Sequence, residues 1–416
     1  MRVRFTITLV GIAALTAGCA WPMAGRGSDR RAWAEHDTTV TPANVATLTA
    51  GPVGPVASAP AEVIGDLGAL FARTGSTVTA FDASSGATKW SVGGLAGTGT
   101  PGLYSGSVWV PVSAARCSVV KLDHDSGGVV DSTLLGPVPG VNWTSSCTTG
   151  DVVIDGDRII VPWRQTMSIV VGCGTNTTVA SGVIAYDLGF NPVWFDSSSV
   201  TACGVPPIPP HNLPRVSRIG DRFVAAATGE TANVYDPATC EDFTVCHPVA
   251  HAVATDGIWV GGATTWTSRN ASQLWSVDAT TAALVWRSPT DSARTVTADP
   301  AFDTDHAFAP SGASGSANLG VYDAGGCGQA TCAPSWTVAL PAVASFRPSI
   351  AGDVVIVATS DKHLVLASRT GCSKSSCSAL RTLTLAGIPT APPSVVAGRI
   401  VIPTTSGIET FALPTP

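Results

Sequence analysis

One short phrase recurs along the chain: an apolar run, a turn opened by aspartate, and a second run that ends in tryptophan. Its clearest copy spans Thr77–Trp90, a second spans Leu274–Trp286, and a looser one spans Val183–Trp194. Each copy predicts two short strands joined by a turn. Repetition of one such unit indicates an array of equivalent modules, and this constrains the fold more than any single residue does.

A second repeated element is a hairpin turn that precedes the first phrase in each unit. Apolar, β-branched runs flank glycine or aspartate at eight positions, and both residue types tolerate the backbone conformations of tight turns. These positions are Gly65, Gly106, Gly156, Gly220, Gly257, Asp305, Gly352 and Gly398. Their mean spacing of about 48 residues is close to the length of a four-stranded propeller blade. The apolar period of two disfavours a helical solenoid.

The two ends of the chain complement each other. The last unit, Ser394–Leu413, ends before a fourth strand, whereas Val45–Val53 is a strand-like segment upstream of the first unit. If this segment fills the vacant outer position, the ring closes without a long exposed edge. The sequence therefore predicts an all-β, eight-bladed propeller of four-stranded antiparallel blades, closed by an amino-terminal strand in the last blade.

These phrases make the chain similar to the PQQ-type (quinoprotein-like) β-propeller repeat family over residues 33–413, so we expect one propeller domain over residues 33–416. The resemblance is specific for the fold. Some copies have drifted: the Tyr-Asp of two units is followed by Cys240 and Cys327, and in residues 364–371 the aspartate is lost. We expect the repeat tryptophans to pack between blades and the aspartates to cap turns.

The amino terminus resembles a bacterial lipoprotein signal. Arg2 and Arg4 precede an apolar run, Phe5–Leu15, which is too short to span a bilayer. The following Thr16-Ala-Gly-Cys19 resembles a lipobox, with Thr16 where leucine or valine is preferred. We expect a signal peptide over residues 1–18, a palmitate-bearing lipidated Cys19 and a flexible tether over residues 19–32. This would anchor the protein to the extracytoplasmic side of the cell membrane. In the alternative, plain secretion, Cys19 is a free thiol.

Ten further cysteines indicate an oxidising compartment. Three pairs enclose short loops at equivalent places in the repeat, which predicts the disulfides Cys240–Cys246, Cys327–Cys332 and Cys372–Cys377 in place of lost turn chemistry. The four remaining cysteines permit three pairings. We favour Cys117–Cys147 and Cys173–Cys203, because each would hold a long insertion.

Three polar clusters could be mistaken for sites. Two thiols and two imidazoles, at Cys240, Cys246, His247 and His251, could bind zinc, but disulfide pairing is favoured. Acidic residues at Asp299, Asp303 and Asp305 with His306 resemble part of a calcium loop, but no closing carboxylate follows, so a hairpin turn is favoured. We expect Glu35-His36-Asp37 to cap or dock the first strand.

Function is constrained by composition and by what the repeat already uses. A net charge of −6 with 12% charged residues gives no basic face for nucleic acid. Quinone-dependent dehydrogenases of the resembled family clamp the quinone between a tryptophan and two adjacent cysteines, and this chain has no Cys-Cys pair. We expect no catalytic, cofactor-binding or metal-binding residues and no cofactor.

The family also contains lipid-anchored members that present the propeller as a docking surface, one of them in the outer-membrane β-barrel assembly machine. The predicted function is a non-catalytic envelope module. It would be a monomer, held by its lipid, that binds or scaffolds a protein, peptide or glycan. The alternative is a quinone (PQQ)-dependent oxidoreductase.

Overall fold

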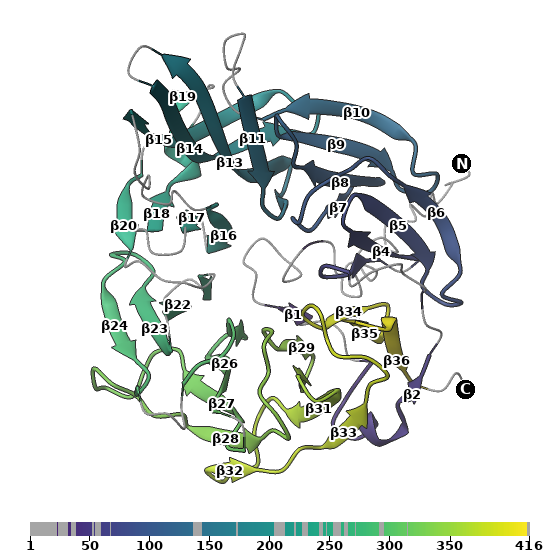
Figure 1. Cartoon of the computed structure of the whole chain (residues 1–416). Coiled ribbons are helices and arrows are strands. Elements are labelled where there is room, and N and C mark those ends of the chain that lie inside the picture. Colours follow the sequence, from purple (N-terminus) through teal and green to yellow (C-terminus); the bar gives the residue numbers. More distant parts are fainter. Residues whose placement is uncertain are drawn as a thin grey trace, which may run out of the picture.

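The computed structural model describes residues 23, 32–34, 39–51, 54, 60–66, 68–135, 144–171, 174–203, 213–219, 222–226, 232–240, 244–246, 248–252, 259–261, 265–270, 272–290, 295–313 and 315–413. Within these residues the strands form eight sheets around a central axis (Figure 1). This confirms the eight-bladed, all-β propeller with four-stranded antiparallel blades.

The first strand of each blade lies at the axis, and each contacts the first strands of the two neighbouring blades, so the ring is closed. These strands are β3 (Ile64–Gly65), β7 (Gly102–Tyr104), β12 (Val153–Asp155), β16 (Arg215–Ile219), β21 (Val260–Gly261), β25 (Ala301–Phe302), β29 (Ser349–Ala351) and β34 (Ser394–Val396). The face on which they begin is called the pocket face. The opposite face, which carries the turns into the second strands, is the turn face.

The remaining three strands of blades one to four follow outward in chain order. They are β4 (Ala69–Thr74), β5 (Thr77–Asp82) and β6 (Thr88–Val92); β8 (Ser107–Val112), β9 (Ser118–Asp123) and β10 (Val129–Leu134); β13 (Arg158–Val171), β14 (Gly174–Asp187) and β15 (Pro192–Cys203); and β17 (Arg222–Ala226), β18 (Ala232–Tyr235) and β20 (Ala250–Ala252). Blade three also holds β11 (Thr144–Thr149) and β19 (Thr244–Val245). A 3-10 helix, η3, spans Pro237–Thr239.

Blades five to eight repeat the pattern. Their outer strands are β22 (Thr265–Asn270), β23 (Gln273–Asp278) and β24 (Leu284–Arg287); β26 (His306–Ser311), β27 (Asn318–Asp323) and β28 (Trp336–Ala339); β30 (Val354–Thr359), β31 (His363–Ser368) and β33 (Arg381–Thr384); and β35 (Arg399–Thr404) with β36 (Gly407–Ala412). The two-residue strand β32 (Ser376–Cys377) adds to blade six.

The second strand of a blade is buried on both faces, because neighbouring blades cover it from each side. Every residue of β8 and β30 is buried. This explains why the runs at Val108–Val112 and Val354–Val357 are continuously apolar instead of alternating. The outermost strands are exposed except for one or two residues that face the next blade, such as Trp286 in β24.

The amino-terminal segment closes the ring, although over fewer residues than predicted. Strand β2 (Thr49–Ala50) pairs antiparallel with β36, joining Thr49 to Ala412 and Ala50 to Phe411, and so supplies the fourth strand of blade eight. The first part of the predicted strand is instead a 3-10 helix, η2 (Val45–Thr47). Arg381 Nη1 donates to the carbonyl oxygens of Val45, Ala46 and Leu48. Hydrogen bonds from this guanidinium therefore hold the turn in place of the backbone bonds of a paired strand.

A further strand, β1 (Trp33–Ala34), was not predicted and lies inside the ring, parallel to β29 (Figure 1). The amides of Ile350 and Gly352 donate to the carbonyl oxygens of Ala32 and Ala34 at 2.7 and 3.1 Å. On the opposite side of the ring, the Ile154 amide lies 3.4 Å from the sulfur of Met23. Met23 and Ala32 belong to the segment predicted as a tether, yet both are buried against the ring.

Candidate binding pocket at the ring axis

A pocket of about 660 Å³ opens at the axis on the pocket face and is lined by residues from all eight blades. Most of these residues lie just before a first strand. Glu62, Thr100, Asp151, Arg215, Asp299, Arg347 and Pro392 each precede the beginning of their blade's second strand by seven residues, as Arg347 precedes Val354. The repeat therefore builds a ring of equivalent side chains around the pocket, and its character varies from blade to blade.

Glu62 and Arg347 of this ring form a buried ion pair. Their side chains are 5% and 6% exposed, and Arg347 Nη2 donates to Glu62 Oε2. The pair joins blades one and seven, which flank blade eight. Arg347 Nε, also buried, has no hydrogen-bond partner in the described part of the chain. Burial of this guanidinium is compensated by a carboxylate, but one of its donors is left over.

Asp299 is shared by two arginines from neighbouring blades. Its Oδ2 lies 3.2 Å from Arg215 Nη1, and its Oδ1 lies 3.9 Å from Arg269 Nε. The three side chains are 17%, 49% and 27% exposed, respectively, so they remain accessible to solvent. One carboxylate thus contacts guanidinium groups from two neighbouring blades.

Arg73 supports the wall between blades one and two. Its side chain is buried, and its guanidinium donates to the carbonyl oxygens of Gly99, Pro111 and Leu95. Desolvation by burial lowers the pKa of Arg73 to about 10, an effect that Asp151 partly opposes. Asp151 in turn accepts a 2.8 Å hydrogen bond from the Thr100 amide. These contacts fix the backbone around the pocket.

The pocket lining carries both acidic and basic side chains. Its described residues include no histidine or cysteine, and the charged groups Glu62, Arg215, Asp299 and Arg347 are engaged in ion pairs. A quinone held in the manner of the resembled family needs a tryptophan opposite two adjacent cysteines, and the described lining offers neither. No metal-binding group of three or more His, Cys, Asp or Glu side chains occurs among the described residues. These residues do not fit a quinone with its metal.

Of the two clusters considered for metal binding in the sequence, one contains a disulfide and the other forms a hairpin turn, the arrangement favoured in each case. Cys240 and Cys246 are bonded to each other, and His251 Nδ1 lies 3.1 Å from Asn233 Oδ1. His247 lies outside the described residues. Asp303 caps the hairpin turn of blade six by accepting from the amides of Asp305 and His306 at 2.8 and 2.7 Å. The structure separates it from Asp299, which lines the pocket.

The described residues contain four disulfides: Cys117–Cys147, Cys240–Cys246, Cys327–Cys332 and Cys372–Cys377. They are four of the five predicted pairs. The fifth, Cys173–Cys203, involves side chains outside the described residues, and so does the predicted lipidation site, Cys19. The triplet Glu35-His36-Asp37 also lies outside them.

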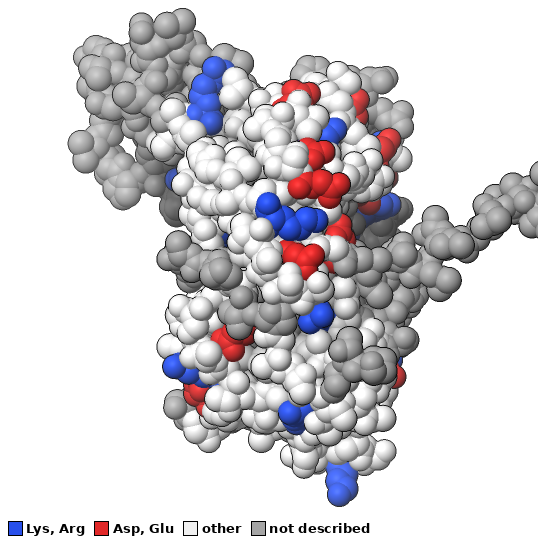
Figure 2. All heavy atoms as spheres, turned by 90° about the vertical axis from the view of Figure 1, so that its right-hand side faces the viewer, with Lys and Arg blue, Asp and Glu red and all other residues white. Residues whose placement is uncertain are grey.

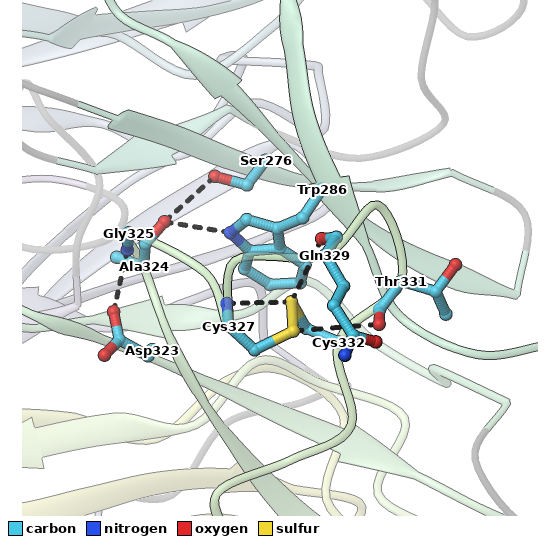
Figure 3. The surroundings of a disulfide bond; sticks show 9 residues. All are labelled: Ser276, Trp286, Asp323, Ala324, Gly325, Cys327, Gln329, Thr331 and Cys332. Atoms are coloured by element: carbon cyan, nitrogen blue, oxygen red, sulfur yellow. Dashed lines mark hydrogen bonds between the residues drawn. A yellow bond between two sulfur atoms is a disulfide. The ribbon is translucent and has the colours of Figure 1, made fainter.

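The three short-loop disulfides share a role that the sequence did not reveal. Each loop pairs, in parallel, with the outermost strand of the preceding blade: β19 with β15, Thr331 with Arg287, and β32 with β28. Figure 3 shows the Cys327–Cys332 loop beside Trp286 of blade five. Asp236 and Asp323 still cap their turns. Asp236 accepts a hydrogen bond from the Ala238 amide, and Asp323 accepts one from the Gly325 amide. In these two units the disulfide therefore adds a clasp between blades and does not replace the aspartate.

The predicted roles of the repeat aspartate and tryptophan are confirmed. The amides and hydroxyls of Ser84 and Ser85 donate to Asp82 Oδ1, and these bonds lower the pKa of Asp82. Equivalent bonds lower the pKa of Asp123 and Asp278. Trp90 Nε1 donates to the His124 carbonyl oxygen of the next blade at 2.9 Å. Its ring covers Gly127, where a Cβ atom would lie only 2.7 Å from the ring, so the absence of a side chain permits the close approach.

Surface charge elsewhere forms no comparable feature on the side drawn in Figure 2. There, in the described part of the surface, acidic and basic side chains are interspersed over a largely uncharged background.

The pocket residues were not predicted from the sequence, because only Asp299 belonged to a recognisable cluster. The signal that could have found them is the shared position seven residues before the second strand.

Comparisons with known proteins support the fold alone. No protein-family model matches the chain, and no curated protein matches its sequence. Among solved structures, a europium-containing methanol dehydrogenase has a TM-score of 0.61 at 13% identity, covering 95% of this chain and 98% of that one. BamB from Moraxella catarrhalis has a TM-score of 0.50 at 14% identity, covering 90% and 96%. The computationally designed protein Ika8 has a TM-score of 0.61 at 11% identity, covering 87% and 98%.

Proposed function

We propose that the chain is a lipid-anchored protein of the bacterial cell envelope whose propeller binds a partner at the axial pocket without catalysing a reaction. The observation that carries the proposal is the pocket itself. Seven blades place side chains at equivalent positions around it, and Glu62, Arg215, Asp299 and Arg347 are ion-paired instead of poised for proton transfer. A rigid ring that presents different side chains from each blade suits recognition.

The envelope location is supported by two features of different origin. The run Phe5–Leu15 with Cys19 has the pattern of a lipoprotein signal. The disulfides Cys117–Cys147, Cys327–Cys332 and Cys372–Cys377 fit an oxidising compartment. None of the helices in the described part of the chain is long and apolar enough to span a bilayer.

Fractionation of a bacterium that produces the full chain tests the anchor. The wild-type protein should sediment with membranes, and Cys19→Ser should move to the soluble fraction, because a lipid anchor would supply most of the membrane affinity. Cys372→Ser is the matched control, since it removes a cysteine from the ring and should leave the protein in the membrane. If Cys19→Ser also stays with the membrane, the lipid anchor is wrong.

A second measurement distinguishes the proposed binding module from a quinone-dependent oxidoreductase. Purified protein is mixed with pyrroloquinoline quinone and calcium, dialysed, and assayed for quinone absorbance and for dye-linked alcohol oxidation. We expect no retained quinone and no oxidation, because the described pocket residues do not provide the clamp. Retention of quinone with turnover would replace the binding module by an enzyme.

A further inference from the structure

Met23 is held inside the ring, a short distance along the chain from the proposed lipid anchor. The Ile154 amide lies 3.4 Å from Met23 Sδ, and Met23 is buried. Ile154 of blade three and Ile350 of blade seven are equivalent, because each stands two residues before the turn glycine of its blade. The Ile350 amide donates to the Ala32 carbonyl oxygen, beside β1. Met23 and β1 therefore contact the inner edges of first strands at the same level, on opposite sides of the ring.

The length of chain between Cys19 and Met23 limits how far the ring can stand from a lipid on Cys19. Cys19 precedes Met23 by four residues, and an extended chain spans at most about 3.6 Å per residue, so about 14 Å at most separates their Cα atoms. The first strands contact one another around the whole ring, so a chain inside it can leave only through one of the two faces. The lipid would thus hold one face of the ring, and not its outermost strands, close to the bilayer.

The two faces differ in how closely they can approach a flat surface. On one side, Ile154 is two residues, about 7 Å, from the turn at Gly156. On the other side, β13 and β14 of blade three contain 14 residues each, whereas β8 and β9 of blade two contain six. Since β13 pairs with β12 only over Arg158–Ile160, it continues past the beginning of β12 on the pocket face. Its extra length, about 25 Å, exceeds the reach of Cys19, so blade three would keep a flat bilayer away from the pocket face.

We propose that the turn face of the ring rests on the lipid bilayer and that the pocket face is turned away from it. This inference rests on the proposed function, since it takes the lipid anchor as given, and it leaves the axial pocket open to a partner. The repeat aspartates that cap turns on this face, such as Asp82 and Asp123, offer no attraction to anionic lipid. The short connection to the anchor, and not surface charge, would therefore hold the face against the bilayer.

Hydrogen–deuterium exchange tests the contact. The lipidated protein is placed on phosphatidylcholine nanodiscs, and Cys19→Ser protein mixed with the same nanodiscs is the reference. The exposed turn-face hairpins at Gly106 and Gly156 should exchange more slowly in the lipidated protein, because the bilayer covers them. The exposed turn at Gly75–Ser76, on the pocket face, should exchange equally in both.

A longer connection is the matched control. An insertion of about twelve Gly and Ser residues between Ala20 and Trp21 adds a flexible chain with a root-mean-square length of about 20 Å. This variant should stay in the membrane fraction but lose the protection at Gly106 and Gly156. Protection that survives the insertion would show that the short connection does not set the contact, and would overturn the proposal.

The other outcomes are equally distinct. Protection of an outermost strand such as β10 would mean that the ring lies on its side, and protection of Gly75–Ser76 would mean that the pocket face meets the bilayer; either overturns the proposal. Unchanged exchange in a protein that sediments with membranes would overturn the contact and leave the anchor standing. A Cys19→Ser protein that remains in the membrane fraction would instead overturn the anchor itself.

Discussion

Glu62 and Arg347 hold each other across blade eight, although 285 residues separate them in the chain. They lie at equivalent positions in the first and seventh blades, and the short segment that enters blade eight, Thr390–Pro392, lines the pocket with them. The carbonyl oxygen of Pro60, two residues before Glu62, accepts a 3.3 Å hydrogen bond from the Thr390 hydroxyl. The pair therefore supports the ring at the blade that is completed by the amino-terminal strand.

Removing one member of this pair should cost more stability than removing both. Arg347→Met leaves Glu62 buried without its counter-charge, and we expect a loss of about 3–5 kcal/mol. The double variant Glu62→Gln, Arg347→Met should recover much of that loss. Urea denaturation of the three proteins gives the free energies of unfolding. A double variant that is as unstable as the single one would contradict the ion pair.

Substitution of Trp286 tests the contribution of its side chain to packing between blades five and six. Its ring is 1% exposed, and its Nε1 donates to the Ala324 carbonyl oxygen at 2.9 Å (Figure 3). Trp286→Ala should lower the free energy of unfolding by about 3–5 kcal/mol, because it opens a cavity. Trp275→Ala, in the neighbouring strand β23 but only half-buried, is the control and should cost less. Equal losses would argue against the interface.

The Cys372–Cys377 clasp should be visible in hydrogen exchange. The Thr337 amide of β28 donates to the Ser375 carbonyl oxygen within the disulfide loop at 3.0 Å. In the double variant Cys372→Ser, Cys377→Ser this amide should exchange faster, with a stability loss of about 2 kcal/mol. The Leu380 amide, bonded to Leu366 in its own blade, should change less. Unchanged exchange at Thr337 would show that the loop holds β28 without its disulfide.

Acid should weaken the contact between blades six and seven. Burial raises the pKa of Asp303, but hydrogen bonds from His306, the turn amides and Arg369 outweigh it and lower the pKa to about 2. Since the folded pKa lies below the ordinary 3.8, this stabilisation is present above pH 4 and is lost as the pH falls towards 2. Relative to wild type, Asp303→Asn should flatten the acid limb of stability against pH. An identical limb would rule out Asp303 as the titrating group.

Two truncations test how the ring is closed. Deletion through residue 38 removes β1 but keeps β2, so blade eight retains its fourth strand. Deletion through residue 54 also removes β2 and exposes the edge of β36. We expect the second deletion to lower the melting temperature far more than the first. Similar melting temperatures would show that β2 contributes little to closure.

Local patterns predicted most of the fold, because each hairpin is specified within a few residues. The turns at Gly106, Gly156, Gly352 and Gly398 adopt the positive φ that their glycines suggested. The position of the closing strand was predicted because the last unit, at the other end of the chain, lacks a fourth strand of its own. Its shortness was not foreseeable, since Arg381, which bonds η2, comes from a different blade.

The pocket was not predicted, because its residues are brought together only by the closed ring. Arg215 begins strand β16, and Asp299 and Arg347 lie just before first strands, so each contacts a residue of another blade only once the ring has formed. The disulfide clasps were missed for the same reason: β32 pairs with a strand of another blade. Strand β1 is two residues long and has no alternating pattern to reveal it.

Strand β1 follows Met23 on the path by which tension on the amino terminus would reach the ring. Because β1 runs parallel to β29, a pull that has released Met23 from Ile154 next loads the bonds from Ile350 to Ala32 and from Gly352 to Ala34. Force then passes to η2 and β2 only after β1 has yielded, so blade seven is strained before blade eight. A short inner strand thus shields the closure of the ring from tension on the chain that precedes it.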